Sequence, residues 1–152
     1  MDGAGSLVLD ASVAAKWYLV AGEDHLADAG AVLAGFSSGR LDLVAPDTIF
    51  TEVASAITVA TLGRQPRLTT PLARLAIDRF LDLPLRIVAS RRFLPVAFDL
   101  VHQHGCALYD AVYLALAQQL GIPFITADRK PYQRIGHLPD VVWLGDYTGA
   151  DQ

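Results

Sequence analysis

Short apolar segments alternate with longer segments of helical periodicity along almost the whole chain of 152 residues. This alternation limits the possible folds more than any other feature, because strands that alternate with helices form a parallel sheet covered by helices on both faces. We expect strands at residues 6–9, 41–46, 85–90, 122–128 and 140–147, and helices at residues 12–20, 24–39, 47–63, 69–83, 91–105 and 109–121. Residues 129–136 are expected to form either a loop or a short helix.

The composition favours one compact domain over residues 1–152. Hydrophobic residues make up 53% of the chain, which is enough for a substantial core, and no linker, repeat or low-complexity tract is evident. No segment reaches 18 uninterrupted apolar residues, so we expect no membrane-spanning segment. The N-terminus also lacks the basic and apolar regions of a secretory signal. The single cysteine, Cys106, allows no disulfide within the chain, and a reducing, cytoplasmic location fits.

The charge balance counts mildly against a nucleic-acid substrate. The formal net charge is −4, whereas proteins that bind nucleic acid usually carry a basic surface. Any such surface must therefore be local or be supplied by a partner. Arg129 and Lys130, directly after Asp128, are the best candidates for contacts with phosphate groups. For Arg91 and Arg92, ordinary solvated surface charge is the better interpretation.

Four carboxylates stand at unusual positions in this pattern. Asp10 and Asp128 each follow an apolar strand, Glu52 interrupts the apolar run IFTEVASAI, and Asp110 lies in the first turn of a helix. Each position also has an ordinary explanation. Asp10 can cap the next helix, Asp110 is a favourable acid in a first turn, Asp128 is typical of a turn, and Glu52 can face solvent.

Together, the four acids predict a cation site. In parallel sheets, ligands bind beyond the carboxyl ends of the strands, where these acids can converge. Two carboxylates ~4 Å apart repel each other by about 4 kcal/mol at an effective dielectric constant near 20, so such a cluster needs a cation to stay ionised. Oxygen ligands alone favour Mg²⁺ or Mn²⁺. A site of this kind can activate a water and stabilise the leaving oxygen in phosphodiester hydrolysis.

The motifs LVLDASV, TEVASAI, LYDAVYLALA and FITAD, in this order and at this separation, resemble those of PIN-domain ribonucleases, in particular the VapC-type toxins of bacterial toxin–antitoxin pairs. The resemblance runs from about Leu7 to Leu144. It implies a three-layer α/β/α sandwich with a mostly parallel central sheet, and a metal-dependent endoribonuclease that cleaves RNA. It also implies that Mg²⁺ or Mn²⁺ is bound by the four acids that the motifs carry over, Asp10, Glu52, Asp110 and Asp128.

The resemblance gives supporting roles to two hydroxyl residues. Ser12 matches a residue that positions the first acid, and Thr126 matches a similar polar residue. Ser12 is as well explained as a helix N-cap, and both roles are compatible, whereas Thr126 is also an ordinary β-branched strand residue. One position departs from the family. Many relatives carry an asparagine three residues after the helical glutamate, where this chain has Ser55, so the support of Glu52 is an open question.

Other functions receive less support from the sequence. Phosphatases of the haloacid dehalogenase type also end the first strand on an aspartate, but they need a second acid two residues later, where this chain has Ser12. No glycine-rich nucleotide motif is present. A non-catalytic, regulatory module that acts with an antitoxin on operator DNA is the alternative in another class. The expected partners are RNA, a protein antitoxin and a second copy of the chain, with residues 12–20 and 48–62 as apolar surfaces for partner or dimer contacts.

Overall fold

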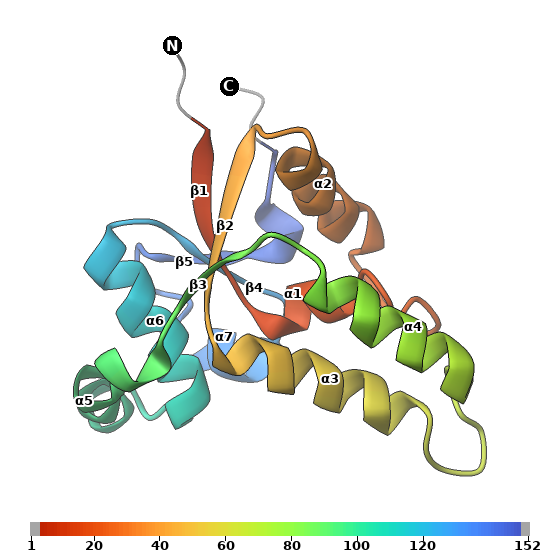
Figure 1. Ribbon diagram of the computed structural model, residues 1–152. Helices are drawn as coiled ribbons and strands as arrows, with labels where there is room; N and C mark the ends of the chain where they lie inside the picture. The colour runs from red at the N-terminus through yellow and green to blue at the C-terminus, as the bar shows by residue number, and fades with distance from the viewer. Residues whose placement is uncertain (1–3, 150–152) are drawn as a thin grey trace.

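A parallel sheet of five strands forms the centre of the molecule in the computed structural model, which describes residues 4–149 (Figure 1). All pairings between neighbouring strands are parallel, in the spatial order β3-β2-β1-β4-β5. The predicted α/β fold with a parallel sheet is therefore confirmed, while a single domain over the whole chain stays a prediction. The strands are β1 (Gly5–Leu9), β2 (Leu41–Pro46), β3 (Arg86–Val88), β4 (Phe124–Thr126) and β5 (Val141–Trp143).

Helices cover both sides of this sheet, as a three-layer α/β/α sandwich requires. In Figure 1, α5 and α6 lie on one side of β1 and β2, and α2 lies on the other. The α-helices in residues 4–149 are α1 (Ala11–Ala15), α2 (Leu26–Ser37), α3 (Thr48–Ala60), α4 (Thr70–Leu81), α5 (Leu94–His104), α6 (Leu108–Leu120) and α7 (Arg129–Ile135), with 3₁₀ turns at Ser90–Arg92 and Leu144–Asp146.

Most predicted elements are shorter in the structure, and three of the differences are instructive. The first helix ends at Ala15 instead of residue 20. The helix expected from residue 91 begins at Leu94, because Pro95 fits only the first turn of a helix. The last strand ends at Trp143 and passes into a 3₁₀ turn. Residues 129–136, left open between a loop and a helix, contain α7.

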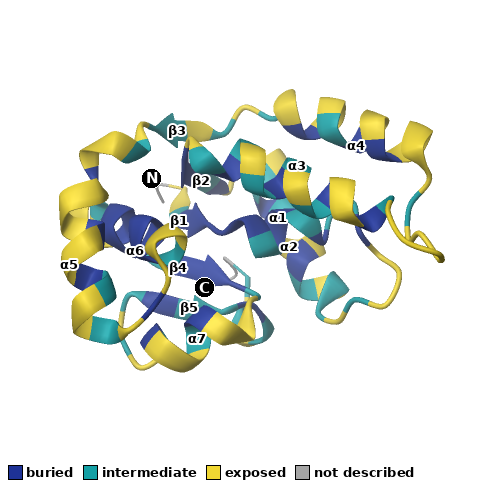
Figure 2. Ribbon diagram, turned by 90° about the horizontal axis from the view of Figure 1, so that it is seen from below, coloured by how far each residue is buried: buried dark blue, intermediate teal, exposed yellow. Residues whose placement is uncertain are grey.

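The hydrophobic core lies on both faces of the central strands. The inner part of β1, all of β4 and most of β2 are buried, as expected for strands of a parallel sheet that helices cover on both sides. Helix α6 is buried over seven consecutive residues, 111–117, because it lies between the sheet and α5 (Figure 2). Exposed residues concentrate on the outer faces of α4 and α5. Within residues 4–149, no helix is both long and apolar enough to cross a bilayer.

The strand order creates a crevice between β1 and β4. The chain runs outward from β1 to β2 and β3 on one side, and then adds β4 and β5 on the other side. Such a reversal leaves a crevice at the carboxyl ends of the two inner strands, which is where open α/β sheets bind ligands. Asp10 lies at this point, directly after β1. Its backbone N–H donates to the Ile125 carbonyl oxygen at 3.2 Å, so Asp10 lies beside the end of β4.

Candidate active site

Asp10 is buried at the crevice and is held by two hydroxyl groups. Its side chain is 3% exposed. Ser12 Oγ donates to Asp10 Oδ2 at 2.5 Å, and Thr126 Oγ1 donates to the same oxygen at 2.7 Å. Burial raises the pKa of Asp10, the two hydroxyls lower it, and the nearby charge of Asp128 raises it. The two hydrogen bonds fix the orientation of a carboxylate that is otherwise costly to bury.

Each hydroxyl also accepts a hydrogen bond from the loop after β4. The N–H of Ala127 donates to Ser12 Oγ at 2.9 Å, and the N–H of Asp128 donates to Thr126 Oγ1 at 3.2 Å. Because each hydroxyl then uses its own hydrogen to reach Asp10, the proton directions are defined. The two backbone N–H groups therefore hold Asp10 through Ser12 and Thr126. The loop after β4 and the end of β1 are tied together at the site.

These contacts correct three of the ordinary explanations. Ser12 is the second residue of α1, not its N-cap, and its hydroxyl bonds to Asp10 and Ala127. Asp10 occupies the N-cap position of α1, but its side chain makes no capping hydrogen bond. Thr126 is fully buried, and its hydroxyl bonds to Asp10, so it is more than a β-branched strand residue. The supporting contacts that the resemblance implied are therefore present.

Glu52 and Asp110 face the same crevice from two helices. Burial raises the pKa of Glu52 to about 7, aided by the charges of Asp10 and Asp110 and opposed by the hydroxyls of Thr48 and Tyr113. Burial also raises the pKa of Asp110 to about 7, with further increases from Asp10 and Asp128 and a decrease from Lys130. Both carboxyls are thus poised to lose or keep a proton near neutral pH.

Tyr113 answers the question of how Glu52 is held. The Tyr113 hydroxyl donates to Glu52 Oε1 at 3.3 Å, from a position on α6 at which the side chain is fully buried. Ser55 has no hydrogen bond to Glu52 among the described residues. One signal for Tyr113 was present in the sequence: it is a phenol within the apolar run of α6, where a buried polar group needs a partner. The ordinary explanation that Glu52 faces solvent is wrong, because the side chain is half-buried.

One hollow brings the four predicted acids together. It has a volume of about 210 Å³, and we call it the acidic hollow. In residues 4–149, however, no three histidine, cysteine, aspartate or glutamate side chains already form a compact metal site. The carboxylates share the hollow without closing around a common point. The residues that line it are Asp10, Ala11, Ser12, Ala15, Glu52, Ala56, Asp110 and Asp128.

Comparison with known proteins gives the same assignment. Residues 7–138 match the PIN domain. The chain belongs to the PIN-domain family. It is also 32% identical over 135 residues to Ribonuclease VapC12 of two Mycobacterium tuberculosis strains, CDC 1551 / Oshkosh and ATCC 25618 / H37Rv. The similarity covers 89% of this chain and 96% of either relative, which supports the predicted membership of the VapC-type PIN ribonucleases.

Asp128, the remaining acid of this PIN domain, both caps a helix and lines the acidic hollow. Its Oδ1 accepts a hydrogen bond from the Lys130 N–H at 3.0 Å, so it caps α7 as a turn residue would. It also lines the acidic hollow. The helix cap and a position in the acidic hollow are therefore compatible, because the cap uses only one of the two carboxylate oxygens.

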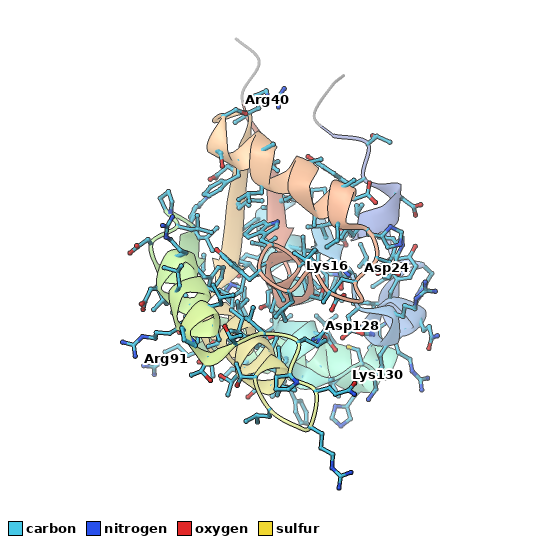
Figure 3. The ribbon with its side chains drawn as sticks, turned by 90° about the vertical axis from the view of Figure 1, so that its right-hand side faces the viewer. Lys16, Asp24, Arg40, Arg91, Asp128 and Lys130 are labelled. Carbon is cyan, nitrogen blue, oxygen red and sulfur yellow. The ribbon has the colours of Figure 1, made fainter. Side chains whose placement is uncertain are left out.

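The two predicted phosphate contacts directly follow Asp128, but only Lys130 is shown to act on an acid of the hollow. The guanidinium of Arg129 lies over the Trp143 ring at 5.6 Å from its centroid and reaches Asp24 Oδ2 at 3.9 Å. Lys130 is close enough to Asp110 to lower the pKa of that carboxyl. Figure 3 shows Asp128 and Lys130 on the same side of the molecule, with Arg91 far from them.

Sequence reasoning missed Lys16, a buried cation near the site. Its side chain is 7% exposed, and its Nζ donates to Glu23 Oε2 at 2.9 Å and to Asp24 at 3.0 Å (O) and 3.2 Å (Oδ1). Figure 3 shows Lys16 and Asp24 beside each other. Lys16 thus anchors the segment between α1 and α2, and Asp24 extends the contact to Arg129. The acids that follow Lys16 by seven and eight residues were the available signal.

Proposed function

We propose that this chain is a metal-dependent endoribonuclease that hydrolyses RNA phosphodiester bonds and acts as the toxin of a type II toxin–antitoxin pair. One observation carries the proposal. One hollow, at the point where the strand order of the parallel sheet reverses, is lined by all four acids: Asp10, Glu52, Asp110 and Asp128. The family membership and the similarity to a VapC ribonuclease agree with it.

The donor set of the acidic hollow fits Mg²⁺ or Mn²⁺. The four proposed ligands offer only carboxylate oxygens, which these ions prefer over nitrogen and sulfur. Burial and mutual repulsion raise the pKa values of three of the four carboxyls, and a divalent cation would remove that penalty. When bound, such an ion activates water and offsets the negative charge of a phosphodiester.

The residues of the chain have separate roles in this proposal. Asp10 is the fixed ligand, because Ser12 and Thr126 hold one of its oxygens and set the direction of the other. Glu52 is held by a hydrogen bond from the buried hydroxyl of Tyr113 on α6. Asp110 and Asp128 complete the set. Arg129 and Lys130 directly follow Asp128 at the start of α7, and their positive charges can attract the RNA backbone toward an otherwise acidic site.

The experiment that tests this function uses a mixed RNA pool and the purified chain. We expect cleavage with Mn²⁺, and none with EDTA or with Asp10→Asn in Mn²⁺. Asp99→Asn, which alters an exposed acid on α5, is the matched control and should cleave as the parent does. Equal cleavage in all conditions would indicate a contaminating nuclease and leave the site unsupported. The Asp10→Asn chain should stay folded, which its circular dichroism spectrum checks.

The proposed partners are a protein antitoxin and a second copy of the chain in the cytoplasm. Neighbouring helices α3 and α4 expose large apolar side chains, among them Val59 at 63%, Leu72 at 55% and Leu75 at 49%. Exposed apolar side chains on adjacent helices are typical of protein-binding surfaces. The regulatory alternative, in which the chain acts only through an antitoxin on operator DNA, predicts that Asp10→Asn leaves regulation intact and that the parent cleaves no RNA.

A further inference from the structure

A second hollow lies next to the acidic hollow and shares one wall with it. It has a volume of about 410 Å³ and is lined by Thr48, Thr51, Glu52, Ser55 and Tyr109. Glu52 lines both hollows. The volume lies within the range of about 300–1,000 Å³ that is usual for small-molecule sites. We call this second space the Tyr109 hollow.

One face of α3 supplies the polar wall of the Tyr109 hollow. Residues 48, 51, 52 and 55 follow the helical spacing i, i+3, i+4 and i+7, which puts them on the same face. Three of these four side chains are hydroxyls. The fourth, Glu52, is the one that the two hollows share. Ser55 is short, so it leaves room at this wall that a longer side chain would fill.

Thr48 Oγ1 is a buried polar atom without a partner. It lies near enough to Glu52 to favour the charged form of that carboxyl, yet no described group meets it with hydrogen-bond geometry. Buried hydroxyls in folded proteins almost always have a partner, and one without a partner needs an explanation. Rotation of Thr48 about its χ1 bond would bring this buried hydroxyl to the adjoining hollow, where a ligand group would supply the missing hydrogen bond.

Tyr109 supplies the opposite, aromatic wall. It directly precedes Asp110, and its side chain is 61% exposed. Among the described residues it makes neither a ring contact nor a hydrogen bond. Other aromatic side chains near the site are occupied: Tyr132 lies against Trp143 with ring centroids 5.1 Å apart, and Trp17 Nε1 donates to the Ala29 carbonyl at 2.8 Å. Tyr109 is therefore an aromatic face free to stack on a ligand.

We propose that the Tyr109 hollow receives one unpaired nucleobase of the RNA, next to the phosphate held at the acidic hollow. The base stacks on Tyr109, and its polar edge meets the hydroxyls of Thr48 and Thr51. This inference rests on the RNA-cleaving function proposed above and adds to it a place and a set of residues that bind the base. A base engaged in a duplex cannot enter the hollow, so the site selects unpaired nucleotides.

The test compares two single-stranded probes with Ca²⁺ as the divalent cation, so that a phosphate can approach the acids. One is a fluorescein-labelled RNA dodecamer of random sequence, and the other is the same ribose-phosphate chain without bases. Binding is measured by fluorescence anisotropy at low ionic strength. We expect the parent chain to bind the RNA about 5- to 150-fold more tightly than the abasic probe, the ratio that a stacked base provides.

Substitutions test whether the ratio of the two probe affinities depends on the Tyr109 hollow. Tyr109→Ala should reduce the ratio to near one, Tyr109→Phe should retain it, and Ser55→Asn should lower it by filling space. Phe98→Ala is the matched control, because Phe98 is 60% exposed on α5, outside both hollows, and this variant should keep the ratio of the parent. Circular dichroism of each variant confirms that it is folded.

The other outcomes overturn either the base-binding proposal or the nuclease function on which it rests. Equal or undetectable binding of the two probes by the parent refutes it, even where the chain cleaves RNA with Mn²⁺, in which case the nuclease function stands alone. A ratio that survives in Tyr109→Ala refutes the role of this hollow. If Tyr109→Ala changes only the oligomeric state in light scattering, the hollow is a contact between copies. Base-dependent binding without cleavage would instead keep the hollow and refute the proposed nuclease function.

Discussion

Replacing Asp110 by asparagine should stabilise the chain in the absence of divalent cations. Asp110 is the cleanest position for this test, because its side chain makes no hydrogen bond among the described residues, whereas Asp10 and Glu52 accept bonds from hydroxyls. Burial and the charges of Asp10 and Asp128 raise its pKa from 3.8 to about 7. Asparagine has nearly the same shape and carries no charge, so the substitution removes the repulsion and little else.

The magnitude follows from this pKa. A difference of about three units corresponds to about 4 kcal/mol once the carboxyl is ionised in both states. Asp110 is only half-buried, so solvent screening reduces the expected gain to about 2 kcal/mol. Because the pKa is higher in the folded chain, Asp110 costs nothing below about pH 4, and its cost grows as the pH rises to about 7. The variant should therefore gain stability at pH 8 and gain none below pH 4.

Urea denaturation of parent and variant in EDTA, at pH 8 and below pH 4, measures this difference. A gain of 2 kcal/mol corresponds to a melting temperature about 4–8 °C higher for a chain of this length. Asp99→Asn on α5 should stay within about 0.5 kcal/mol of the parent at both pH values. An Asp110→Asn chain that is no more stable than the parent at pH 8 would refute the argument from burial and repulsion.

Three further results are expected. Mn²⁺ affinity, measured by calorimetry, should rise about tenfold or more from pH 6 to pH 8, because Glu52 and Asp110 have pKa values of about 7 and must lose their protons to bind; a flat profile would contradict this. Thr126→Val should lower the free energy of unfolding in urea by about 1–3 kcal/mol by removing a donor from a buried carboxylate, while Thr126→Ser should lose less. Lys16→Met should lower the melting temperature by about 5 °C, because two acids lose their buried cation, and an unchanged temperature would show that the pairs contribute nothing.

The sequence was sufficient for the sheet and for the edge at which the site lies. Strand and helix periodicities are local properties, and parallel strands all end at the same edge. Asp10 and Asp128 could therefore be assigned to a common place without knowledge of the strand order. The motifs of the PIN family added Glu52 and Asp110, which lie on helices and whose direction no local pattern defines.

The contacts that decide the role of each site residue could not be predicted from the sequence. Whether Ser12 caps a helix or holds Asp10 depends on Thr126 and Ala127, which lie more than 110 residues away along the chain. The support of Glu52 by Tyr113 depends on the rotation of α3 relative to α6. The burial of Lys16 depends on a segment that folds back over it. All three are properties of packing between distant segments.

Because β1 comes first in the chain and its neighbour β4 comes late, the acidic hollow is completed only near the end of translation. Asp10 leaves the ribosome early, but the Thr126 hydroxyl that holds it comes 116 residues later. At about 5–20 residues per second, translation of that interval takes roughly 6–23 s. Throughout this time β1 lacks its neighbour β4, and the fourth acid has not been made. A nascent chain, or one released early, therefore lacks both the complete set of four acids and the hydrogen bond that orients Asp10.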